Sequence, residues 1–92
     1  MYNFKPQTSR ELIDKYFSLE WCKDNLIMPI STESNSNTNI FWIAIPNYAY
    51  LATLSGPIKS RIKQDDPNIE IIFIEKSFKE IEEMLDKVST PN

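Results

Sequence analysis

An uninterrupted apolar stretch runs from Ile40 to Ile45, with the sequence Ile-Phe-Trp-Ile-Ala-Ile, and Pro46 and Asn47 end it. A strand with one face in water alternates apolar and polar residues, whereas a strand covered on both faces is apolar throughout. We therefore predict that residues 40–45 form the central strand of a β-sheet against which helices pack.

Upstream of this strand the sequence predicts a helix and a second strand. Thr8 stands three residues before Glu11, the spacing of a capping box. A stripe with the 3.6-residue period of a helix follows at Leu12, Ile13, Tyr16, Phe17 and Trp21, and Asp24-Asn25 is a stop signal. Residues 26–30 have the composition of a strand. Because proline cannot donate to a ladder, Pro29 predicts either that this strand is an edge or that this position points outward.

The segment between the two strands, residues 31–39, reads Ser-Thr-Glu-Ser-Asn-Ser-Asn-Thr-Asn. It contains no apolar residue, and a run of Ser, Asn and Thr is typical of a loop. We predict a mobile surface loop here. A tolerated insertion is one interpretation of it and a binding loop is the other.

Downstream, helical spacing recurs and a third strand is predicted. Apolar residues stand at Leu51, Leu54, Ile58 and Ile62, but Gly56-Pro57 interrupts them. Proline disrupts a helix interior and is accepted at its first position, so we expect two short helices, or one kinked helix, with Pro57 opening the second piece. Residues 69–75 predict a strand. Ser77 and Glu80 form a capping box for a last helix, whose predicted buried stripe is Phe78, Ile81, Leu85 and Val88.

The predicted order of elements is α-β-β-α-β-α, which places the chain in the α/β (α+β) class with a three-stranded mixed sheet. The first two strands are expected to be antiparallel, and the second and third to be parallel with a right-handed crossover through a helix. Residues 1–7 are predicted to be an extended arm, residues 8–88 a single α/β domain, and residues 89–92 a tail or linker.

The composition excludes several classes of function. The chain has 92 residues, a net charge of −3, no histidine, one cysteine and one glycine. Without histidine the usual base and metal ligand are missing, and Gly56 alone cannot form a phosphate-binding loop. Cys22 is expected to be a small, partly buried side chain rather than a reactive thiol. We therefore predict a non-catalytic cytoplasmic protein with no cofactor, no metal site, no nucleic-acid partner and no membrane insertion.

Two groups of side chains are candidates for binding a protein partner. Tyr48 and Tyr50 follow the predicted central strand, and in α/β sheets ligands meet the carboxyl ends of strands. Lys59, Arg61 and Lys63 form a basic segment in an acidic chain and could orient an acidic partner or a phosphate. The alternative interpretations are that the tyrosines cover the top of the core and that the three cations form the solvent face of a helix.

Residues 21–85 resemble the N-terminal domain of type II secretion and type IV pilus assembly ATPases. The stretches that carry the resemblance are Met28-Pro29-Ile30-Ser31, Ile43-Ala44-Ile45-Pro46-Asn47, Ile71-Ile72-Phe73-Ile74, and Ser77 followed by Glu82-Glu83. The segment between Pro46 and Ile69 is longer than the family pattern, and Gly56-Pro57 is unusual within it.

The resemblance implies a docking or regulatory module that joins a cytoplasmic motor to membrane-platform proteins of a bacterial secretion or pilus machine. The chain is then either a stand-alone adaptor or the first domain of a longer protein. Some family members bind cyclic di-GMP through an Arg-Leu-Gly motif, for which this chain has only Arg10-Glu11-Leu12. The alternative function, a sensor of a cyclic dinucleotide, therefore has no ligand residue that can be carried over.

Overall fold

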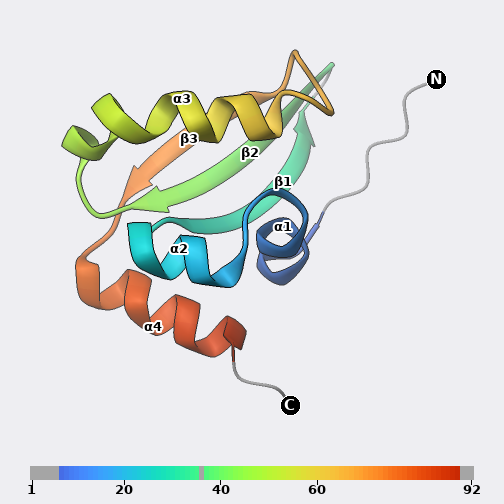
Figure 1. The fold of residues 1–92 in the computed structure, drawn as a ribbon. Coiled ribbons are helices and arrows are strands. Elements are labelled where there is room, and N and C mark those ends of the chain that lie inside the picture. The colour runs from blue at the N-terminus through green and yellow to red at the C-terminus, as the bar shows by residue number, and fades with distance from the viewer. Residues whose placement is uncertain (1–6, 36, 90–92) are drawn as a thin grey trace.

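The computed structural model describes residues 7–35 and 37–89 (Figure 1). Its elements, in chain order, are α1 (Ser9–Tyr16), α2 (Leu19–Asn25), β1 (Met28–Asn35), β2 (Thr38–Ile45), the 3-10 helix η1 (Tyr48–Tyr50), α3 (Leu51–Ile62), β3 (Glu70–Glu75) and α4 (Phe78–Ser89). The predicted arm and tail fall outside the described residues except for Gln7 and for Ser89, which is the last residue of α4.

The sheet has the predicted composition and topology. Its strand order is β1-β2-β3, so β2 is central, and it pairs antiparallel with β1 and parallel with β3. Phe41 lies opposite Thr32 on one side and Ile71 on the other. The mixed three-stranded sheet and its α+β class are therefore confirmed, and the apolar run of residues 40–45 is indeed the strand between two neighbours.

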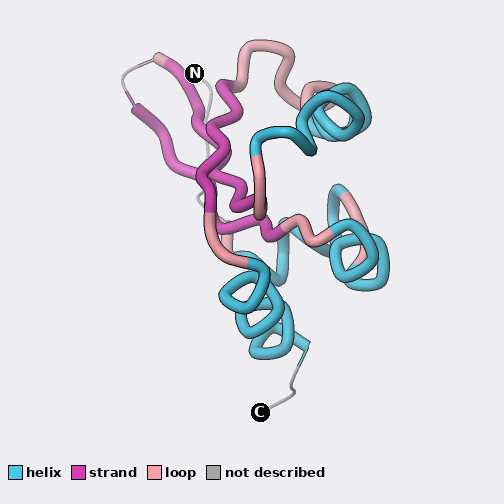
Figure 2. The backbone as a smooth tube through the Cα atoms, turned by 90° about the vertical axis from the view of Figure 1, so that its left-hand side faces the viewer, coloured by secondary structure: helices cyan, strands magenta, loops and turns pink. Residues whose placement is uncertain are grey.

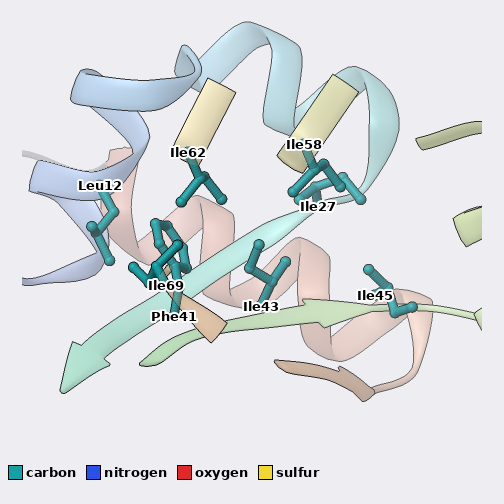
Figure 3. Packing of buried hydrophobic residues seen from close by; sticks show 8 residues of the cluster. All are labelled: Leu12, Ile27, Phe41, Ile43, Ile45, Ile58, Ile62 and Ile69. Atoms are coloured by element: carbon teal, nitrogen blue, oxygen red, sulfur yellow. The ribbon is translucent and has the colours of Figure 1, made fainter. Parts of the chain in front are cut away.

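The side chains of β2 enter two separate parts of the core. Phe41, Ile43 and Ile45 alternate along one face, where they pack with Leu12, Ile27, Ile58, Ile62 and Ile69 (Figure 3). Ala44 lies on the opposite face, in a second cluster with Ile13, Cys22, Met28, Ile81 and Leu85. Figure 2 shows the strands at one side of the molecule and the helices gathered at the other side and around the lower end.

The single helix predicted after Thr8 is wrong, because two helices occupy that segment. The capping box of Thr8 and Glu11 forms as expected, but α1 ends at Tyr16 and α2 starts at Leu19. The hydroxyl oxygen of Ser18 accepts the backbone N–H of Trp21 at 3.1 Å. Because serine is a good N-cap residue, this bond supplies the start of a new helix within the predicted one.

The loop predicted over residues 31–39 is also wrong in extent. Residues 31–35 continue β1, residues 38 and 39 begin β2, and the ladder extends to the pair Asn35 and Thr38. A polar strand can pair because ladder hydrogen bonds join backbone groups, whatever the side chains are. The edge position predicted for Pro29 is confirmed, and a register shift lies between Pro29 and Ser31.

The prediction that Pro57 opens a second helical piece is wrong. Pro57 lies inside the continuous helix α3. A proline there removes the hydrogen bond to the carbonyl four residues earlier, which is that of Thr53. Thr53 and Pro57 are both exposed, so water can reach this part of the helix. The neighbouring Ile58 and Ile62 are fully buried, and their burial holds this helix on the sheet.

Candidate functional site

The carboxyl ends of the two parallel strands carry the most exposed aromatic side chains of the described residues. Tyr48 follows β2 and is 51% exposed, and Phe78 follows β3 and is 49% exposed. Tyr50, the last residue of the 3-10 helix after β2, is an edge-on neighbour of Phe78, with ring centroids 6.3 Å apart. We call Tyr48, Tyr50 and Phe78 the aromatic cluster.

The cluster is held by backbone contacts at this end of the sheet. The side chain of Asn47 accepts the N–H of Ala49 at 2.8 Å and starts η1. The N–H of Tyr48 donates to Glu75 Oε2 at 3.1 Å, and the Tyr48 hydroxyl donates to the carbonyl of Phe73 at 3.4 Å. Tyr48 therefore spans from the end of β2 to β3, which positions its ring beside the neighbouring strand.

Phe78 was predicted to be part of a buried stripe, and this is wrong. The hydroxyl of Ser77 accepts the N–H of Glu80 at 3.1 Å, so the predicted capping box forms and Phe78 becomes the first helical residue. Ile81 and Leu85 carry the burial of α4. The side chain of a first-turn residue projects beyond the helix start, which leaves Phe78 half exposed next to Tyr50.

Leu26 extends the apolar surface from the cluster toward α2. It is the C-cap residue of α2 and has left-handed backbone angles, with φ 54° and ψ 51°. Such angles are strained for a bulky side chain and are often found at functional positions. A surface cavity of about 250 Å³ lies between the end of α2 and the start of α3, lined by Asp24, Asn25, Leu26, Tyr50, Thr53 and Leu54.

Leu26 also lines a second cavity on the side of α4. This cavity, of about 430 Å³, has the lining residues Lys23, Leu26, Lys79, Glu82, Glu83, Leu85 and Asp86. Its walls carry both positive and negative side chains around an apolar floor. An apolar centre with a polar rim of both signs is the usual composition of a surface that docks another protein.

The basic segment predicted as part of the same surface lies elsewhere. Tyr50 directly precedes α3 and Lys63 directly follows it, so the two are about 20 Å apart along the helix axis. The Lys63 ammonium donates to the carbonyls of Pro67 and Ile69, at 3.4 and 3.2 Å, and thereby ties the turn before β3. The fold does not bring Lys63 to the aromatic cluster.

Arg61 is turned toward the helices at the N-terminal part of the chain. Its guanidinium lies 5.1 Å from the ring centroid of Trp21 and 5.9 Å from that of Phe17, and these two rings are stacked. It also donates to the carbonyl of Tyr16 at 3.2 Å. Arg61 therefore joins α3 to the break between α1 and α2, and Lys59 is the residue of the segment that remains exposed without such a contact among the described residues.

Replacing Arg61 by alanine is expected to lower the free energy of unfolding by about 1–2 kcal/mol. The change removes a cation–π contact and a hydrogen bond to a carbonyl, each worth about 1 kcal/mol. The matched change Lys59→Ala, two residues away on α3, is expected to alter the free energy of unfolding by less than about 0.5 kcal/mol. Urea unfolding followed by circular dichroism measures both, and equal effects of the two changes would contradict the structural role of Arg61.

A polar triad links α1 to the turn before β3. The Tyr16 hydroxyl donates to Asp65 Oδ2 at 2.9 Å, and the Lys15 ammonium lies 3.2 Å from the same oxygen. These two donors lower the pKa of Asp65, and the bond to Asp65 raises the pKa of Lys15. Burial, and then the bond to Asp65, raise the pKa of Tyr16. Each shift favours the form that is present at neutral pH, which is the pattern of a structural contact.

Cys22 was predicted to be partly buried, and the structure buries it fully. Burial raises the pKa of its thiol to about 12, against smaller lowering effects from the Ser18 backbone and the Arg61 charge. The thiolate is the reactive form, so this thiol is unreactive at neutral pH. Within residues 7–35 and 37–89, no three Cys, Asp or Glu side chains are arranged to hold a metal ion.

Comparison of the chain with known protein families, with curated proteins and with solved structures finds no match. In the part of the chain that the structure describes, no helix has the length and apolar character needed to cross a membrane. The features of this chain that bear on its function are therefore the aromatic cluster and the cavities beside it.

Proposed function

We propose that this chain is a non-catalytic protein-interaction module of the kind that docks the motor of a type II secretion or type IV pilus machine onto its membrane platform. In this role it works in the cytoplasm and binds a protein component of the machine. The proposal combines the sequence resemblance with the exposed aromatic cluster at the carboxyl end of the sheet.

The fold supports the proposal through its order of elements. The stretches that carry the resemblance form β1, β2, β3 and the start of α4, in that order. A fold supports many functions, so this agreement supports the type of domain rather than its partner.

The observation that carries the proposal is the exposure of two aromatic side chains at the carboxyl ends of the parallel strands, Tyr48 after β2 and Phe78 after β3. Both are about half exposed, and large aromatic side chains are enriched at protein interfaces, where they supply much of the binding energy. Leu26 and Leu54 continue this apolar surface along the cavity wall. A partner that presents an apolar ridge with polar flanks fits such a surface.

Affinity capture with a matched bait tests the proposal. The wild-type chain and the Phe78→Ala variant are immobilised and exposed to lysate of a cell that contains the secretion or pilus machine, and bound proteins are identified by mass spectrometry. We expect a platform or motor component on the wild-type bait and a depleted amount on the variant. Equal recovery on both baits, or recovery of no component of such a machine, contradicts the proposal.

Cyclic di-GMP is expected not to bind at micromolar concentration. Besides the missing glycine, Arg10 is already engaged, because its guanidinium donates to the carbonyl of Val88 at 2.8 Å and pairs with Asp14 at 3.2 Å. These two contacts hold the Arg10 side chain against α1 and the end of α4. Isothermal titration calorimetry measures this directly, and a saturable heat signal would favour the sensor function over the docking function.

A further inference from the structure

The two edges of the sheet are protected to very different degrees. At the β1 edge, Pro29 and the adjacent register shift interrupt the ladder. The chain that leads into α1 also covers this edge, because the N–H of Gln7 donates to the Thr32 hydroxyl at 3.0 Å and the hydroxyl of Ser9, the first residue of α1, donates to the carbonyl of Ile30 at 2.8 Å. Proline, bulges and covering segments are the devices by which proteins prevent strand addition at an edge.

The β3 edge has none of these devices among the described residues. The N–H of Lys76 donates to the carbonyl of Ile45 in β2. Since backbone groups alternate in direction along a strand, the N–H and C=O groups of Ile71, Phe73 and Glu75 point away from β2. Among the described residues, the contact at these outward groups is the hydroxyl of Tyr48, which lies 3.4 Å from the Phe73 carbonyl.

The side chains of β3 also favour strand addition. Four consecutive apolar residues, 71–74, are each only partly buried, although they pack beside the core. Charges stand only at the two ends, as Glu70 at the start and Glu75 and Lys76 at the finish. An apolar, unbulged edge strand whose outward backbone groups are not paired with another strand is a template for strand addition.

We propose that two copies of this chain associate through their β3 edges, antiparallel about a two-fold axis at Phe73, to form a continuous six-stranded sheet. In this register Phe73 lies opposite the second copy's Phe73, and both exchange N–H···O=C bonds because their backbone groups point outward. Glu75 and Ile71 then form the flanking hydrogen-bonded pairs. A second copy fits this edge because β3 has a negative charge at one end, Glu70, and a positive charge beyond the other, Lys76, so that two antiparallel copies pair opposite charges.

Charge selects this register from its neighbours. A two-fold axis normal to the sheet keeps each side chain on the same face, so the axis passes through a residue position. With the axis at Phe73, Ile72 faces the second copy's Ile74, and Glu70 faces its Lys76 at both ends. With the axis at Ile72, Glu70 faces the apolar Ile74 instead. Opposite charges on facing strand positions stabilise a pair and an unpaired charge beside an apolar residue does not.

Tyr48 controls access to this edge. Its hydroxyl lies 3.4 Å from the Phe73 carbonyl, on the outward side where the second copy pairs, and so competes with the second copy for this edge. Tyr48→Phe removes the hydroxyl and keeps the ring, so we expect this variant to dimerise about threefold more tightly than the wild type, since it has no such bond to break.

Sedimentation velocity from about 10 µM to about 1 mM protein tests the association, a range that includes weak pairs. We expect a concentration-dependent dimer that Glu70→Lys or Lys76→Glu each weakens about tenfold, and that the two changes together restore. The two single changes move the net charge in opposite directions, so a general charge effect cannot weaken both. Glu82→Lys on α4 is the matched control and is expected to leave the dimer unchanged.

Cysteine cross-linking tests the register. Facing positions that are not hydrogen bonded have Cα atoms about 4.5 Å apart, which a disulfide can bridge. A mixture of Ile72→Cys and Ile74→Cys proteins is therefore expected to cross-link, whereas neither alone does so, and the buried Cys22 stays free. The proposal is overturned by a monomer throughout the range, by a dimer that the charge changes do not affect, or by cross-linking of Ile72→Cys with itself. Circular dichroism confirms that each variant is folded.

Discussion

Replacing Phe41 by alanine is expected to lower the free energy of unfolding by about 3–5 kcal/mol. Phe41 is fully buried in the central strand and packs in a cluster that receives side chains from α1, from α3 and from Ile27, which precedes β1. Its ring also meets that of Tyr16 edge-on, with centroids 5.8 Å apart. The change leaves a cavity where the strand layer and the helix layer meet, and the surrounding isoleucines cannot fill it.

The size of this loss matters because the domain is small. A chain of this length has a total stability of about 5–14 kcal/mol, so the variant is expected to lose a large share of it. Urea unfolding at constant m-value measures the change. Tyr48→Ala removes an aromatic ring of similar size from the surface and is expected to cost less than about 1 kcal/mol. If the two variants unfold at the same urea concentration, the assignment of the core is contradicted.

Replacing Phe78 by alanine is expected to weaken binding of the protein partner by about 2 kcal/mol or more, which is roughly a thirtyfold rise in dissociation constant. The half-exposed ring contributes little to the core, so the variant should retain the wild-type thermal unfolding profile. Tyr50→Ala is expected to weaken binding to a similar degree, but Tyr50 is half buried and its variant requires the same thermal check.

Lys59→Glu serves as the comparison for this experiment. Lys59 is the cation of the basic segment nearest to Tyr50 along α3, at about 13 Å along the helix axis, so it lies outside the aromatic cluster and tests a charge at the margin of the docking surface. Rim charges alter association rates and their salt dependence more than they alter dissociation. Surface plasmon resonance with the captured partner is expected to show a slower association for Lys59→Glu and a faster dissociation for Phe78→Ala. If Phe78→Ala and Tyr50→Ala both dissociate from the partner at the wild-type rate, the aromatic cluster is excluded as the docking surface.

Several features of the fold could be predicted from short stretches of sequence. The apolar run of residues 40–45 predicts a strand covered on both faces, and β2 is that strand. The spacing of Thr8 and Glu11, and of Ser77 and Glu80, predicts two helix starts that the structure confirms. These predictions succeed because capping and strand burial depend on residues that are close together in the chain.

The candidate site could be predicted only in part. The position of Tyr48 and Tyr50 after β2 follows from the order of strands and helices. The exposure of Phe78 could have been predicted from the capping box itself, since that motif makes Phe78 the first residue of the helix. No local pattern indicates Leu26, whose backbone angles depend on how α2 ends against β1.

What the sequence by itself determined is the three strands and their order, the two capping-box helix starts and most of the apolar residues that are buried, because periodicity, capping and turn chemistry act over a few residues. Only the tertiary structure decided that the polar residues 31–35 pair as a strand, that the exposed Arg61 lies over the Trp21 ring, and that β3 keeps an open edge. These outcomes depend on groups that are distant in the chain. Their energies arise only when folding brings the two sides into contact and removes the water between them.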